Sequence, residues 1–329
     1  MRPSITNRVA NSTLTLPGAL VLGSSLWALV WRPELLGVIL ATAFTAYVLM
    51  ETNNRNTLIR VRTRSMSSLF WLGAPLVYIA LASHGGESLV RVVAEALAME
   101  GVEDLAPVSG REMSLLAYGA TPCLLALATF ALFSTYGETE PVTSVFHCFV
   151  ALGAAVCFCP PLVVCVPAFL LYLIIYMNVW SARVFSAALL GLMLVAMCAT
   201  LLVVTRTVPA EAFFPHLQMP TLETFRVYPA SIVVMLMGFV GMCYFLGHNY
   251  DDKIQVRMMH YVLVCQWMLA QLLLVLQPGW LQALAPVSWF CTAPLVAYQL
   301  SLSDSLWTSF WAVLILAVIV GFMVWTFAI

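Results

Sequence analysis

The sequence AALLGLMLVAMCATLLVV, residues 187–204, contains no Asp, Glu, Lys or Arg. At about 1.5 Å per residue, an α-helix of this length is roughly 27 Å long, close to the roughly 30 Å hydrocarbon core of a bilayer. A helix satisfies its backbone hydrogen-bonding groups within the segment, which lipid requires of any spanning element. The stretch therefore predicts a transmembrane helix.

Apolar windows of this kind recur along the whole chain. Of its 329 residues, 62% are hydrophobic and 9% are charged, whereas soluble domains contain about a quarter charged residues. We expect an all-α fold, a polytopic transmembrane helix bundle that forms a single integral membrane domain over residues 1–329. The windows predict about eleven spans, within a range of about ten to twelve. They cover residues 14–31, 35–50, 67–83, 114–133, 145–159, 161–177, 187–204, 229–247, 258–277, 281–300 and 306–329.

The fifth and sixth windows, 145–159 and 161–177, are short for a full crossing and meet at Cys159-Pro160-Pro161. Consecutive prolines lack backbone donors and disfavour a continuous helix. We interpret this junction first as a tight helical hairpin. Two alternatives stay open: a re-entrant pair, which leaves the downstream sidedness unchanged, and one long kinked helix, which inverts it.

The basic residues between the windows predict the orientation, because cytoplasmic connections carry an excess of Lys and Arg. With the N-terminus in the cytoplasm, the larger set falls inside: Arg2, Arg8, Arg55, Arg60, Arg62, Arg64, Arg183, Lys253 and Arg257. The smaller set falls outside: Arg32, Arg91, Arg111, Arg206 and Arg226. We therefore expect a cytoplasmic N-terminus, an external amphipathic and acidic loop at residues 84–113, and a second external loop at residues 205–228.

Residues 53–64 form the densest basic segment of the chain. A guanidinium group matches phosphate oxygens, and the cytoplasmic leaflet is anionic. Arg60, Arg62 and Arg64 are therefore candidate lipid- or phosphate-binding residues. The alternative is that they only set the topology, since several arginines in one inner loop are what orientation requires.

The predicted loop at residues 205–228 holds weak candidates for catalysis, namely Arg206, His216 and Arg226. An imidazole can act as a general base while arginines bind a diphosphate. These are also ordinary loop residues. The sequence contains no Walker loop, dinucleotide fingerprint, zinc-protease helix or nucleophile elbow. Whether the protein is an enzyme therefore stays undecided.

Two segments contain the residue types of metal sites. The first groups His147, Cys148, Cys157, Cys159 and Cys165, and the second joins residues 248–253 to His260. Neither spacing matches an established motif, buried cysteine packs as a small hydrophobe, and adjacent aspartates are common in turns. We expect no metal site and no cofactor.

The deeper polar residues of the windows are mostly neutral: Thr42, Thr45, Tyr47, Gln266, Gln271 and Gln299. We expect them to form hydrogen bonds between helices, with coordination of a neutral substrate as the alternative. The scarcity of ionisable groups disfavours a carboxylate-based proton relay.

Two segments, ETNNRNTLIRVRTRSMSSLFWLG at 51–73 and residues 146–185, resemble uncharacterised polytopic inner-membrane proteins of Bacteroidota bacteria. The resemblance implies a multi-pass protein of the bacterial inner membrane and no particular activity.

These features together predict a protein that handles or assembles a lipid-linked cell-envelope substrate, by translocation or as a scaffold. Its expected partners are membrane lipids, the lipid-linked substrate and other membrane proteins. Nucleic acid is not expected, because the formal net charge is -1 and no basic stripe occurs. The alternative is a membrane-embedded enzyme of envelope glycan assembly that uses the external loops.

Overall fold

The fold comes from a computed structural model of the chain. It describes residues 44–45, 48, 51–52, 55–56, 58, 108–179, 181–204, 229–277 and 280–302. All regular secondary structure in these ranges is helical. For the described residues, this confirms the predicted all-α class.

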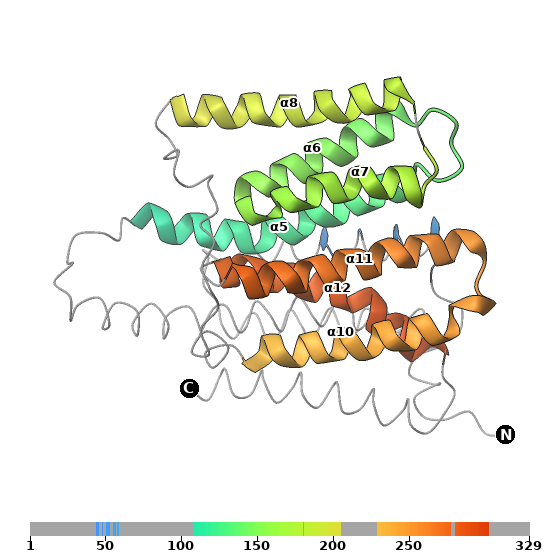
Figure 1. The fold of residues 1–329 in the computed structure, drawn as a ribbon. Coiled ribbons are helices and arrows are strands. Elements are labelled where there is room, and N and C mark those ends of the chain that lie inside the picture. The colour runs from blue at the N-terminus through green and yellow to red at the C-terminus, as the bar shows by residue number, and fades with distance from the viewer. Residues whose placement is uncertain are drawn as a thin grey trace.

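Within the described ranges, short connections join α5 to α6, α7 to α8 and α10 to α11. Their bounds are α5 Val108–Phe133, α6 Val142–Phe158, η3 Pro160–Val164, α7 Cys165–Ile175, α8 Ala182–Val204, α10 Pro229–His248, η5 Asn249–Asp251, α11 Ile254–Leu276 and α12 Leu281–Leu302, where η denotes a 3₁₀ helix. Most of the α-helices run alongside one another (Figure 1).

Helix α12 occupies the centre of this arrangement. It packs against α5, α10 and α11, while α6 packs against both α5 and α8. The residues from Leu284 to Tyr298 are all buried, so α12 has no lipid- or water-facing stripe over that length. A helix that is apolar on every side is typical of the interior of a bundle.

The Pro160-Pro161 junction reverses the chain. Helix α6 ends at Phe158, η3 begins at Pro160, and α7 then runs back beside α6 (Figure 1). Glu140, just before α6, forms an ion pair with Arg183 at the start of α8. The chain has therefore returned to the end of the bundle where it started. A single kinked helix over 145–177 is therefore excluded, whereas the reversal fits both the predicted tight hairpin and the re-entrant pair.

Two described helices are long and apolar enough to cross a membrane, Ala182–Leu201 and Ile254–Leu276. They coincide with the predicted windows at 187–204 and 258–277. Shorter apolar helices cover Ala120–Phe133, Val142–Phe158, Pro160–Ile175 and Val234–His248. Several other predicted windows, including 14–31, 67–83 and 306–329, lie outside the described residues.

Helix α5 begins earlier than the sequence pattern predicts. The apolar window starts at residue 114, whereas the helix starts at Val108. Residues 108–113, the last part of the predicted external loop at 84–113, are therefore helical. The rest of that loop and the predicted loop at 205–228 lie outside the described residues.

Candidate functional site

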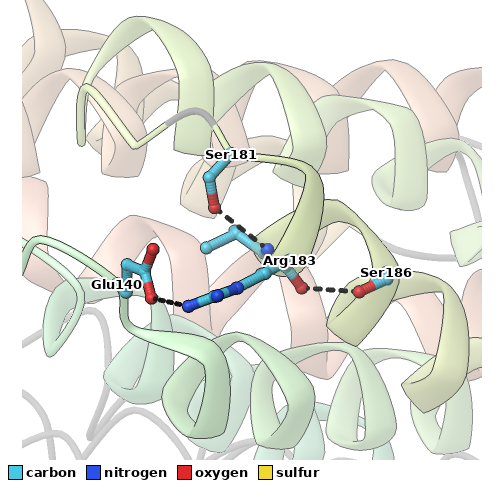
Figure 2. Close-up of polar contacts among 5 residues, drawn as sticks. Glu140, Ser181, Arg183 and Ser186 are labelled. Atoms are coloured by element: carbon cyan, nitrogen blue, oxygen red, sulfur yellow. Dashed lines mark hydrogen bonds and ion pairs between the residues drawn. The ribbon is translucent and has the colours of Figure 1, made fainter.

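Exposed charged contacts mark one end of the bundle. Arg183 Nη1 donates to Glu140 Oε2 at 2.9 Å (Figure 2). The guanidinium of Arg55 lies 5.6 Å from the centre of the Phe130 ring, in the last turn of α5. The segment around Arg55, the α5–α6 connection and the start of α8 therefore meet at the same end.

Helix α8 starts at this end with a side-chain cap. Ser181 Oγ accepts a hydrogen bond of 3.2 Å from the backbone N–H of Val184 (Figure 2). A serine in this position satisfies one of the backbone donors that a helix start leaves without a partner. The cap and the ion pair together fix where α8 begins.

Two further contacts bring the second half of the chain to the same end. Tyr298 Oη, near the end of α12, donates to Asp252 Oδ2 at 2.5 Å. Tyr176, directly after α7, stacks on Tyr261 in the second turn of α11, with ring centres 6.1 Å apart. We call this the polar end of the bundle, and define it by residues 55, 134–141, 176–183, 248–261 and 298.

One aromatic side chain of the polar end and one from the adjoining turn of α10 enclose the His260 imidazole. His260 is 1% exposed. Its ring stacks on Phe245 of α10 at 5.2 Å and meets Tyr298 of α12 edge to face at 4.8 Å. Its Nδ1 lies 2.9 Å from the backbone oxygen of Val256. A carbonyl oxygen can only accept, so Nδ1 carries a proton and donates it to Val256.

Asn249 ties the α10–α11 connection to α11. Its Nδ2 donates to Tyr261 Oη at 2.8 Å, and the side chain is 4% exposed. Within the part of the chain that the structure describes, its Oδ1 has no hydrogen-bond partner. The amide nitrogen of Asn249 therefore donates to Tyr261, while its amide oxygen remains an unused acceptor at the polar end.

The candidate hard-ligand residues at 248–253 and His260 do not come together. His248 is exposed and stacks on Tyr244 of its own helix, with ring centres 4.2 Å apart. His260 is buried instead, and the Asp252 carboxylate accepts from Tyr298. Among the described residues, no group of His, Cys, Asp and Glu is arranged to hold a metal ion.

The cysteines of the hairpin also face different surroundings. His147 is exposed and Cys157 is partly buried, whereas Cys148, Cys159 and Cys165 are buried. Buried thiols in apolar contact behave as small hydrophobic groups. The described geometry therefore favours the packing role over a soft-metal constellation.

Neutral polar side chains join α11 to its neighbours in the middle of the bundle. Gln266 Nε2 donates to Thr129 Oγ1 at 3.0 Å, Trp267 Nε1 to Thr292 Oγ1 at 3.1 Å, and Gln271 Nε2 to Ser288 Oγ at 2.8 Å. The expectation that Gln266 and Gln271 bond between helices is confirmed. Their partners on α5 and α12 were not predicted, because a lone Ser or Thr in an apolar window carries no signal of what it faces.

The remaining predicted site residues lie outside the described residues. This applies to the candidate lipid-binding arginines Arg60, Arg62 and Arg64, and to the catalytic candidates Arg206, His216 and Arg226. Their roles stay predictions from the sequence. Of the other neutral polar residues, Thr45 is buried, whereas Thr42 and Tyr47 lie outside the described residues.

Comparisons with protein-family models, with curated proteins and with solved structures find no match for the chain. The class of protein is therefore inferred from the fold and from the chemistry of its surfaces.

Proposed function

We propose that this is a multi-pass protein of the bacterial cytoplasmic membrane, an all-helical bundle of about eleven spans, with its polar end in the cytoplasm. The observation that carries the proposal is the outer face of α8. Large apolar side chains recur on it at four-residue intervals, and each is at least half exposed: Phe185 (52%), Leu189 (50%), Met193 (60%), Met197 (64%) and Leu201 (63%).

The exposed apolar face distinguishes α8 from the core helix of a soluble protein, which is mostly buried. In its membrane-length window only 22% is buried, against 61% for the window in α11. Monomeric soluble proteins rarely expose continuous apolar patches larger than a few hundred Å². Lipid tails are as apolar as these side chains, so a bilayer removes the cost of exposing them.

The polar end supports the proposed sidedness. The described basic residues that the charge pattern assigns to the cytoplasm, Arg55, Arg183, Lys253 and Arg257, all belong to this end or lie in the segments that converge on it. Positive residues near span ends favour the cytoplasmic side. Because the chain reverses between α6 and α7, successive helices from α8 to α12 can cross the membrane in alternating directions with these basic residues on the cytoplasmic side.

For the role in the membrane, we propose that the protein handles or assembles a lipid-linked envelope substrate as a translocator or scaffold. The central polar groups of α11 support a non-catalytic role, because they bond to neighbouring helices. Helices α6, α7, α8, α10, α11 and α12 contain no Asp or Glu. Proton-driven pumps and many ion-coupled transporters place costly ionisable groups within their spans.

Lipid analysis of a deletion strain, together with that of the purified protein, tests this proposal. We expect a lipid-linked intermediate to accumulate in the strain and to copurify with the protein. An unchanged lipid profile, together with no bound lipid-linked species, would contradict it. A change in a soluble metabolite alone would instead point to a different substrate class.

A further inference from the structure

Helices α6 and α8 approach each other closely along one seam. A Cβ atom placed on Gly153 of α6 would lie 3.1 Å from Cβ of Val195 in α8. With a C–C bond of about 1.5 Å at each end, the two Cα atoms are within about 6 Å of each other. Few other residue types would allow the backbones to come this close.

The two helices run in the same direction along this seam. Gly191 of α8 lies opposite Phe149 of α6, and Val195 lies opposite Gly153. A step of four residues forward on α6 thus matches a step of four residues forward on α8. This register determines which residues meet one turn further on.

One turn further on, the seam brings two cysteines together. Cys157 follows Gly153 by four residues, so by this register it lies level with Ala199 of α8. Cys198 is the residue next to Ala199, and at three residues from Val195 it also lies on the seam side of α8. The two thiols are close enough to interact electrostatically. At the preceding turn, the Cα atoms of Gly153 and Val195 are at most about 6 Å apart, and a disulfide joins Cα atoms roughly 4.4–6.8 Å apart.

These thiols are also the reachable ones in this region. Cys198 is exposed and Cys157 is partly buried. The neighbouring Cys159 and Cys165 are buried. An oxidant that enters from the side of α8 therefore meets Cys198 first and Cys157 next.

We propose that Cys157 and Cys198 form a redox-active dithiol whose disulfide locks α8 to α6, with a disulfide compound as the oxidant. The thiolate of Cys198 attacks the oxidant, forms a mixed disulfide and releases one half of the oxidant as a thiol. The Cys157 thiol then attacks the Cys198 sulfur and releases the other half. The protein is oxidised, the oxidant is reduced, and each protein thiol gives up its proton to a leaving half.

The location of the pair fits this chemistry. In the proposed topology, on which this step rests, both cysteines lie toward the external ends of their helices. Disulfides persist on that side of a bacterial cytoplasmic membrane and are rare in the cytosol. The bond would tether α8 to α6, the helix against which it packs.

The test uses the full-length protein in detergent and 4,4′-dithiodipyridine, a small disulfide that enters apolar surroundings. After oxidation and blocking of free thiols, trypsin cleaves after Arg183 and Arg206. The peptide 184–206 contains Cys198 and no other cysteine. In the oxidised wild type, we expect mass spectrometry to find this peptide joined to the segment that ends at Arg183. Dithiothreitol should release it.

Serine variants identify the partner. Cys157→Ser and Cys198→Ser should abolish the link, whereas Cys159→Ser, the matched control two residues away, should retain it. A free 184–206 peptide in the oxidised wild type, or a link that survives Cys157→Ser, would overturn the proposal. The measurement in detergent does not depend on sidedness. Its failure is therefore distinguishable from a failure of the proposed topology, which reporter fusions measure separately.

Discussion

The contact between α10 and α12 makes Gly241 a position where a single added methyl group meets backbone atoms. A Cβ atom at this position would lie 2.9 Å from both the backbone carbon and the backbone oxygen of Leu295, and 3.1 Å from its Cβ. Backbone atoms cannot rotate away as a side chain can, so Gly241→Ala must push the two helices apart. Overpacking of this kind costs about 1–3 kcal/mol. The displaced segment leads one turn later to Tyr298, which holds Asp252.

The matched control is Gly247→Ala in the last turn of the same helix, where an added Cβ meets nothing within 4 Å. Alanine favours helix over glycine by up to about 1 kcal/mol, so this variant should be neutral or slightly more stable. Unfolding in mixed detergent micelles, followed by circular dichroism, measures both free energies of unfolding. A Gly241→Ala protein as stable as the Gly247→Ala protein would refute the close α10–α12 approach.

Three other predictions concern orientation, the polar end and the basic loop. Reporter fusions should read cytoplasmic at Arg62 and Asp252 and external at Glu103 and Glu211; an external signal at Asp252 with a cytoplasmic one at Arg62 would contradict the proposed sidedness. Tyr298→Phe removes the donor to Asp252 and should lower the free energy of unfolding by about 1–3 kcal/mol; Asp252→Asn should add little in that background, and fully additive losses would argue against the bond. Replacing Arg60, Arg62 and Arg64 together by lysine should preserve insertion and function if these residues only set the topology; a correctly inserted but inactive variant would instead show that they grip a phosphate with forked hydrogen bonds.

Much of the described fold could be predicted, because continuous apolar windows and prolines act locally. The window at 258–277 corresponds to α11, and the double proline at 160–161 marks the reversal after α6. The start of α5 could not be placed as well. Its first residues, 108–113, contain Arg111 and Glu112 and lack the apolar pattern. Hydropathy locates the part of a helix that faces lipid, and a helix can continue beyond it.

The cross-helix contacts were harder to predict, because they depend on rotation and register between distant segments. Gln266 and Gln271 are conspicuous in an apolar helix, but five residues of helix turn them toward different neighbours, α5 and α12. The close approach at Gly153 and Gly191 has the same origin. Small residues in an apolar window indicate tight packing only after the facing helix is known.

The polar end shows how residues of metal-binding type can be engaged by other partners. A carboxylate near the end of a bundle needs hydrogen-bond donors, since its burial without them is costly. Tyr298 supplies one to Asp252, and His260 directs Nδ1 to a carbonyl of its own helix. A divalent ion at this position would compete with the Tyr298 hydroxyl for the Asp252 carboxylate and with Phe245 and Tyr298 for the His260 ring. The hydrogen bond that joins the end of α12 to the α10–α11 connection therefore also opposes a metal site.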